Sequence, residues 1–295
     1  MQLSQAIADF GDWRKFKTCP NTNKGYDLTL KQFCIFCRDK DIEDVGLKDV
    51  MDWFNLMREL GYDINSFIPK AIALRKLFEF YKQQDFKVLD SWLIPVPNRE
   101  FKNARVATED DYRTLLENIP TKTNDPRHIR NLALVGLLWD TGARNGELLS
   151  LNIKDLDLEN KRAVIRTEKN RGSKPFRTIF WSDDTNDKIK NWIKKKELLG
   201  LDNEALFVSL CNVKIGERLS IKGVGELLRQ YSKKAGLENM NAHSFRHHLG
   251  HEIIKQGGSN SDVANILGHA SLQSTMVYTR MSDPEIENRY RKLIN

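Results

Sequence analysis

Apolar residues recur with the period of an α-helix in most parts of this chain of 295 residues. In the first hundred residues the helical spacing is clearest at 30–37, 50–57 and 68–81. Polar joints at 21–23 and 61–63 separate these segments. Short amphipathic helices must bury their apolar faces against one another, so this part of the chain predicts a small helical bundle.

Prolines and polar residues break the helical pattern between two parts of the chain. Pro95 and Pro97 precede a polar stretch, and Thr108 then begins a new helix with acidic residues in its first turn, as in a capping box. A chain of this length has room for two domains. We therefore predict one domain in residues 1–100 and a second in residues 101–295.

Helical patterns return in the second domain around one segment with strand character. The expected helices cover 112–119, 127–140, 187–199, 223–235, 243–256, 262–267 and 284–293. Within them, 132–139 is almost wholly apolar and should be buried. Short apolar runs between 156 and 180 flank a turn at 170–173 and predict strands with a basic loop. The predicted fold is mainly α with a small β-sheet, in which a helical domain precedes an α+β domain.

The net charge of +7 arises wholly from the second domain. Residues 1–100 carry 15 basic and 15 acidic side chains, so the remaining residues carry 32 basic against 25 acidic ones. Segment 161–180 alone holds seven basic residues and a single acid, Glu168. Such a dense basic segment predicts a polyanionic partner, most often nucleic acid. A solvated hairpin face is the alternative explanation for a charge run taken alone.

Composition and the chain start exclude several other classes. Hydrophobic residues make up 40% and charged residues 29%, which is typical of a folded protein rather than a disordered one. The start lacks a signal-peptide pattern and no apolar run is long enough for a bilayer, so we expect a cytoplasmic protein without a membrane partner. The cysteines are too few for a disulfide framework. Cys34 and Cys37 lie in an apolar helical stripe, which predicts core packing rather than zinc binding.

The segment 141–151 holds the first group with chemical potential. Gly142 forms a turn after the buried helix, which places Arg144 at the start of the next helix and Glu147 one turn later. An arginine there can direct its planar guanidinium at a phosphate, assisted by the amides of a helix N-terminus. A surface ion pair between Arg144 and Glu147 is the alternative explanation for this segment alone.

Two further motifs lie nearer the C-terminus. His243 and Arg246 are three residues apart and share a helix face, so one can exchange a proton while the other holds charge. Leu267-Gly268-His269 follows, and Tyr278 stands nine residues after the histidine. A tyrosine near a histidine does not identify a site by itself, because most tyrosines are packing residues.

Taken in order, these motifs resemble the tyrosine recombinase (phage integrase) family, and the chain is similar in size to Xer-type recombinases. The family signature is a first-box Arg, a hairpin Lys, a His-x-x-Arg, a Leu-Gly-His and a nucleophilic Tyr, which this chain matches across 108–282. The resemblance implies catalytic roles for Arg144, His243, Arg246, His269 and Tyr278. For the hairpin lysine our alignment selects Lys169, with Lys174 as the alternative.

The resemblance implies site-specific recombination of double-stranded DNA through a 3′-phosphotyrosine intermediate and Holliday-junction strand exchange, as in integration, excision or dimer resolution. The arginines would clamp the phosphate, Tyr278 would attack it, His243 would assist deprotonation and Lys169 would protonate the leaving 5′ oxygen. No cofactor or metal is required. The basic side chains that we predict to contact DNA are Lys161, Arg166, Arg171, Lys174 and Arg177.

The resemblance also implies an assembly. Residues 1–100 would form a helical, SAM-like DNA core-binding domain, and residues 101–295 the catalytic domain. Four protomers would act on two DNA duplexes. The apolar stripe of the last helix, 284–294, would dock into a neighbouring protomer.

Other functions stay open at this point. A type IB topoisomerase uses the same kinds of residue, and a DNA-binding module without catalysis would keep the basic hairpin. His243, His247 and His251 share one helix face and could suggest a metal site. Because no cysteine or carboxylate cluster completes such a site, we predict that these histidines do not bind a metal.

Overall fold

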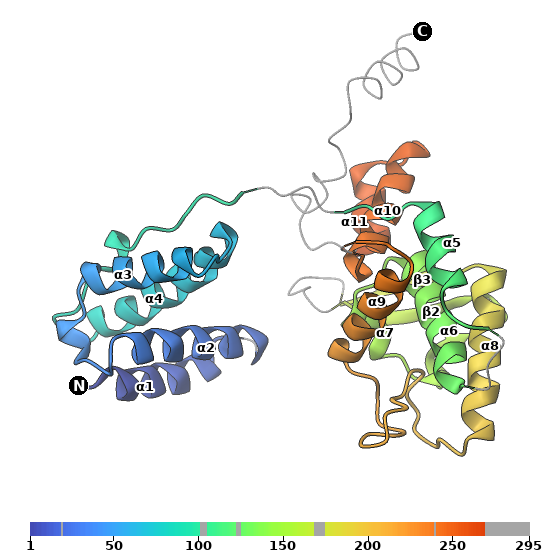
Figure 1. Cartoon of the computed structure of the whole chain (residues 1–295), viewed down its shortest axis with the longest axis horizontal. Helices are drawn as coiled ribbons and strands as arrows, with labels where there is room; N and C mark the ends of the chain where they lie inside the picture. Colours follow the sequence, from blue (N-terminus) through green and yellow to red (C-terminus); the bar gives the residue numbers. More distant parts are fainter. Residues whose placement is uncertain (19, 101–104, 122–124, 168–174, 239, 269–295) are drawn as a thin grey trace, which may run out of the picture. The chain divides into compact units, whose positions relative to one another are not determined.

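The computed structural model describes residues 1–18, 20–100, 105–121, 125–167, 175–238 and 240–268. The chain divides into two compact units, Met1–Asn103 and Ala104–Asn295, which we call unit 1 and unit 2. Helices dominate both units, and a small antiparallel sheet lies in unit 2 (Figure 1). The predicted fold class, mainly α with a small β-sheet, is confirmed. No helix in the described ranges is long and apolar enough to cross a membrane.

Unit 1 is built from helices that share one apolar core. Its α-helices are α1 (Leu3–Lys15), α2 (Pro20–Phe36), α3 (Leu47–Glu59) and α4 (Phe67–Lys82), and its 3-10 helices are η1 (Ile42–Asp44), η2 (Ile64–Ser66) and η3 (Ser91–Leu93). Aromatic rings connect the helices. The ring centroids of Phe33 and Trp53 lie 5.2 Å apart between α2 and α3, and those of Phe54 and Phe67 lie 5.5 Å apart between α3 and α4. Unit 1 therefore has its own core.

One predicted joint in unit 1 is wrong. The polar stretch 21–23 lies in the first turn of α2, which begins at Pro20. Proline is favoured at a helix start, because its φ is already helical and its missing N–H has no partner there. Asn23 bonds back to the connection from α1, since its Nδ2 donates to the Thr18 carbonyl at 3.4 Å. Short polar side chains of this kind serve a helix N-terminus as readily as a loop.

Unit 2 places its sheet between helices. The helices are α5 (Glu109–Glu117), α6 (Pro126–Thr141), α7 (Asn145–Leu149), η4 (Ile153–Asp155), α8 (Asp183–Leu198), α9 (Ile221–Lys234), α10 (Ala242–Lys255) and α11 (Asn260–Leu267). The strands β1 (Leu156–Asp157), β2 (Arg162–Arg166) and β3 (Phe176–Phe180) pair in sequence order. In β2 and β3 every second residue faces inward, as the buried Ala163, Ile165 and Ile179 show.

The helix α6 forms the centre of unit 2. Of the run 132–139 that we predict to be buried, residues 133–138 are buried and Leu132 and Trp139 are half-buried, and the helix packs against α8 and α10. Asp125 caps its start by accepting from the Arg127 amide at 2.9 Å. Near its other end, the Trp139 ring stacks between the rings of Tyr112 and His248. Its centroid lies 4.3 Å from that of Tyr112 and 4.0 Å from that of His248, which joins α5, α6 and α10. The capping box predicted at Thr108 is also confirmed, through Asp111 at the start of α5.

Candidate active site

The turn after α6 brings Arg144 to the start of α7. Gly142 ends α6 with φ +52°, a left-handed conformation that favours glycine. A Cβ at Gly142 would also lie 2.9 Å from Leu267 Cδ2, so no larger residue fits without a shift. Arg144 then occupies the N-cap position of α7 with extended backbone. The predicted placement of Arg144 at a helix start is confirmed.

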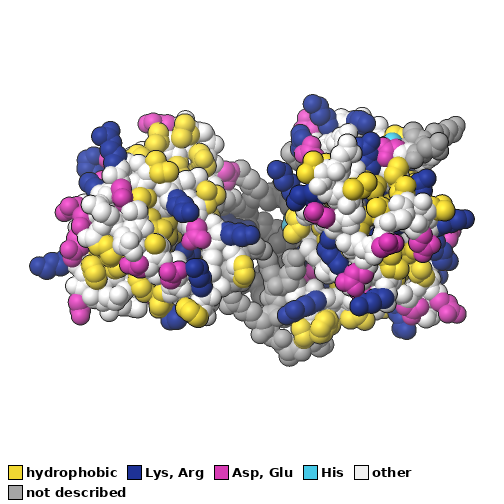
Figure 2. All heavy atoms as spheres, turned by 90° about the horizontal axis from the view of Figure 1, so that it is seen from below, with side chains coloured by type: hydrophobic (Ala, Val, Ile, Leu, Met, Phe, Trp, Pro, Cys, Tyr) yellow, Lys and Arg dark blue, Asp and Glu magenta, His cyan; other side chains and the backbone are white. Residues whose placement is uncertain are grey.

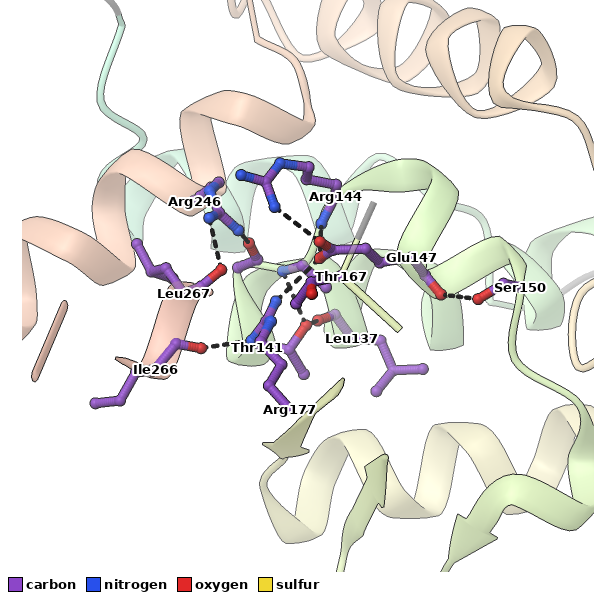
Figure 3. A network of polar contacts seen from close by, with 12 residues as sticks. Leu137, Thr141, Arg144, Glu147, Ser150, Thr167, Arg177, Arg246, Ile266 and Leu267 are labelled. Carbon is purple, nitrogen blue, oxygen red and sulfur yellow. Dashed lines mark hydrogen bonds and ion pairs between the residues drawn. The ribbon is translucent and has the colours of Figure 1, made fainter. Parts of the chain in front are cut away.

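Glu147 occupies the centre of a buried polar network, which Figure 3 shows in close-up. Its carboxylate accepts from the Arg144 amide at 3.0 Å, from Arg144 Nη1 at 2.7 Å and from Arg177 Nη2 at 3.1 Å. Burial acts to raise the pKa of Glu147, but the Arg144 amide and the charges of Arg177 and Arg144 outweigh it and lower the pKa. The contact between Arg144 and Glu147 is therefore a buried ion pair and not a surface one.

Arg246 joins three motifs that are far apart in the sequence. Its side chain is buried, with Nη1 donating to the Gly142 carbonyl at 2.7 Å and Nη2 donating to the Leu267 carbonyl at 2.6 Å. Gly142 belongs to the turn before Arg144, and Leu267 ends α11. These two bonds fix the plane of the Arg246 guanidinium next to the first-box turn (Figure 3).

His243 lies in the first turn of α10, one turn before Arg246. Asn241 caps this helix, and its Oδ1 accepts from the His243 amide at 2.9 Å. The His243 residue is exposed whereas Arg246 is buried. A histidine at this place stays accessible to a bound molecule, while the arginine is held inside the site.

Gly268 lies where the end of α11 approaches Arg177 of β3. It ends α11 with φ +69°, and a Cβ there would lie 2.7 Å from Arg177 Cδ. The glycine of the Leu-Gly-His motif is thus required both by its backbone conformation and by the close approach of Arg177. Several predicted site residues lie outside the described residues: Lys169, Arg171, Lys174, His269 and Tyr278.

The described members of the predicted DNA-contacting set lie in two kinds of place. Lys161 lies in the turn before β2 and pairs with Asp183 at 2.8 Å, and Arg166 is exposed at the end of β2. Arg177 instead points inward from β3, and its side chain is only 7% exposed and bonded to Glu147. Figure 2 shows basic and acidic side chains interspersed on the face it presents, so that face carries no large patch of one charge.

Sequence reasoning missed the positioning groups of this site. Arg177 was counted with the basic hairpin, yet β-strand alternation places it on the same face as the apolar Ile179 two residues later, and this signal could have indicated burial. Arg218 belongs to none of the sequence motifs that indicate the site. Its Nη1 donates to the carbonyls of Leu149 at 2.7 Å and Leu151 at 3.0 Å, which fixes the end of α7.

On the histidine face of α10, His247 and His251 are half-buried, and of the cysteine pair Cys34 is half-buried and Cys37 is buried. Burial, together with the charges of His243 and His251, lowers the pKa of His247. Burial raises the pKa of Cys34 to about 11 and that of Cys37 to about 12, assisted by nearby carboxylates. In the part of the chain that the structure describes, no group of three or more His, Cys, Asp and Glu side chains could hold a metal ion.

Known proteins are similar to this chain in sequence, and solved structures are similar to it in fold. Residues 105–285 match the phage integrase family. Tyrosine recombinase XerC of Roseiflexus castenholzii is 29% identical over 269 residues, which cover 89% of this chain and 83% of XerC. The Tn1549 transposon integrase in complex with transposon right end DNA has a TM-score of 0.75 at 19% identity, with 100% of both chains covered. The XerH site-specific recombinase bound to palindromic difH substrate has a TM-score of 0.70 at 23% identity, covering 91% of this chain and 78% of XerH.

The solved structures share the fold, and the family match extends over more than half of the chain, including the turn at Gly142 and the His243-x-x-Arg246 motif on α10. The chain therefore belongs to the phage integrase family and is a tyrosine recombinase.

Proposed function

We propose that this chain cuts and rejoins double-stranded DNA at a specific recombination site through a 3′-phosphotyrosine bond on Tyr278. The observation that carries the proposal is the pair of fixed arginines. Arg144 and Arg246 come from different helices, and hydrogen bonds to Glu147 and to the Gly142 carbonyl hold both beside the Gly142 turn. Two guanidiniums held in this way suit a phosphate that gains charge in the transition state, because they need no reorganisation when that charge develops.

Structures of similar fold support DNA as the substrate. They include the Tn1549 integrase with transposon right end DNA and XerH with a difH substrate. Glu147 is paired with two guanidiniums, those of Arg144 and Arg177, while Arg246 donates to the carbonyls of Gly142 and Leu267, so the arginines of this network carry more charge than the one carboxylate balances. A phosphodiester bound there would balance this charge.

Each motif residue has a separate role in the proposed reaction. Tyr278 attacks the scissile phosphorus, and the 5′ oxygen leaves as the phosphotyrosine bond forms, so the bond energy is kept for rejoining. His243 assists removal of the phenol proton, Lys169 donates a proton to the leaving 5′ oxygen, and His269 bonds a non-bridging oxygen. Arg144 and Arg246 stabilise the charge of the pentacoordinate phosphorus.

The assembly and the domain roles belong to the same proposal. Unit 1 would bind the core DNA site as the SAM-like helical domain, and unit 2 would hold the chemistry. Four protomers would act on two duplexes in the cytoplasm, with the tail of each one docked on its neighbour.

Single-turnover cleavage tests the arginine pair. We expect Arg144→Ala and Arg246→Ala to slow cleavage by about 100-fold or more at saturating DNA, because each removes a donor that acts on transition-state charge. The dissociation constant for the DNA site should change much less. Arg113→Ala, which removes an exposed arginine paired with Glu109, is the matched control and should cleave normally. Normal cleavage by either active-site variant once DNA saturates would contradict the proposal.

Relaxation of supercoiled plasmids distinguishes a recombinase from a topoisomerase. The proposed function predicts relaxation only of plasmids that carry the recombination site. Relaxation of plasmids of arbitrary sequence would indicate topoisomerase activity, and binding without any strand cleavage would indicate a module without catalysis.

A further inference from the structure

Two buried arginines hold the C-terminal end of α11. The carbonyl of Ile266 accepts from Arg177 Nη1, and the carbonyl of Leu267 accepts from Arg246 Nη2. The last carbonyls of a helix have no partner within the helix, and positive charge is favourable beside them. These two bonds therefore fix the point at which the chain leaves α11 toward Gly268 and His269.

Arg177 connects that helix end to the first box. It lies on the inward face of β3, and its Nη2 donates to the Glu147 carboxylate at 3.1 Å. The same carboxylate holds the guanidinium of Arg144 at 2.7 Å. Gly268 leaves room for the Arg177 side chain, since a Cβ there would lie 2.7 Å from Arg177 Cδ. One side chain thus contacts both the group that orients Arg144 and the segment that leads to His269 (Figure 3).

The chemistry of the site requires a guanidinium at this place. Burial lowers the pKa of Arg177, and the Glu147 carboxylate opposes that effect. A guanidinium carries its donors in a planar fork and can bond a carboxylate and a carbonyl at once. A lysine ammonium is a compact and more strongly hydrated charge, so it cannot reproduce the two contacts from the same backbone position.

We propose that Arg177 is a positioning residue that aligns Arg144 and the segment carrying His269 for cleavage, and that it does not act by binding DNA. The inference rests on the proposed function. Loss of the two contacts would therefore reduce cleavage while leaving DNA affinity largely intact.

The test compares Arg177→Lys with Arg162→Lys in the full chain. Arg162 lies on β2 with its side chain 51% exposed and pairs with Asp157, so its replacement controls for a change of basic residue in the same sheet. For Arg177→Lys we expect single-turnover cleavage at saturating site DNA to fall by about 10- to 100-fold, as for a small misplacement of reacting groups. The dissociation constant for the site DNA should change by less than about threefold. Arg162→Lys should behave like the wild type in both measurements.

Hydrogen exchange gives a readout that does not depend on cleavage. The Gly268 amide donates to the Ala264 carbonyl at the end of α11. Release of the Ile266 carbonyl in Arg177→Lys should speed amide exchange in peptides that cover 263–268, and Arg162→Lys should not change it. Arg177→Met keeps a similar length without a buried charge, and serves as the second variant if the lysine variant does not fold. The same loss of cleavage and faster exchange are expected.

Several outcomes would overturn this inference. Normal cleavage and exchange in a folded Arg177 variant would refute positioning, and weaker DNA binding with normal saturated cleavage would show that Arg177 contacts DNA. If the proposed function itself is wrong, the wild-type chain will not cleave the site DNA at all. The hydrogen-exchange measurement would still report on the contacts of Arg177.

Discussion

Replacing Glu147 by Gln tests how much the buried ion pair stabilises unit 2. The substitution keeps the size of the side chain but removes the negative charge from between two guanidiniums that are 17% and 7% exposed. Removal of one partner of a buried pair costs about 3–5 kcal/mol, and we expect the lower end because an amide oxygen still accepts a hydrogen bond. With an m-value of roughly 2 kcal/mol per M urea, the unfolding midpoint should fall by about 1.5 M at pH 7.

The difference in stability between the wild type and Glu147→Gln should depend on pH, in the sense given by the lowered pKa of Glu147. The folded-state pKa of Glu147 is lower than its ordinary value of about 4.3, so the unfolded chain binds a proton at this group more readily. The stabilisation is therefore fully present above the unfolded pKa and is lost as pH falls through the folded pKa. The gap between wild type and Glu147→Gln should narrow below about pH 4.3.

Pulsed hydrogen exchange during urea denaturation measures this effect, because it reports peptides of unit 2 separately from those of unit 1. Glu226→Gln is the matched control. It removes the carboxylate of an i, i+3 pair with Arg229 whose side chains are 61% and 71% exposed, and its midpoint should equal that of the wild type. Equal midpoints for Glu147→Gln and the wild type at pH 7, or a gap that does not depend on pH, would refute the reasoning.

Three further predictions concern the reaction. A 5′-phosphorothiolate leaves without needing a proton, so this substrate should rescue Lys169→Ala; rescue of Lys174→Ala instead would make Lys174 the general acid. EDTA should leave single-turnover cleavage unchanged, and loss of cleavage that Zn²⁺ or Mg²⁺ restores would contradict a metal-free mechanism. Deletion of 286–295 should leave a folded protein that binds its site but fails to form synaptic tetramers in native gels, and normal tetramers with normal recombination would exclude exchange of the tail.

Local signals in the sequence were enough to predict most of the fold. The apolar period located most helices from residue 30 onward, and a side-chain cap such as Thr108 marked a helix start, whereas α1 and the first half of α2 were not predicted. The exception at 21–23 arose because asparagine and threonine favour both turns and helix starts, and only the packing of α1 on α2 decides between them.

The site was predictable only in part for a different reason. Motif spacing selected Arg144, His243 and Arg246 as candidates, but the partners of Arg246 come from elements distant in sequence. Glu147 was visible next to Arg144, yet its burial depends on Arg177 approaching from β3. A dense basic segment does not indicate which of its members points inward, and Arg177, which we predict from its charge to contact DNA, is a member that does.

The central claim, a covalent DNA intermediate on Tyr278, is tested most directly by trapping it. Wild-type protein and Tyr278→Phe are incubated with a nicked suicide substrate that carries the recombination site, and the adduct is digested and located by mass spectrometry. We expect a nucleotide joined through its 3′ phosphate to the peptide that contains Tyr278 in the wild type and no adduct in Tyr278→Phe, although both bind the site equally. An adduct formed by the Phe variant, or one located on another residue of the wild type, would contradict it.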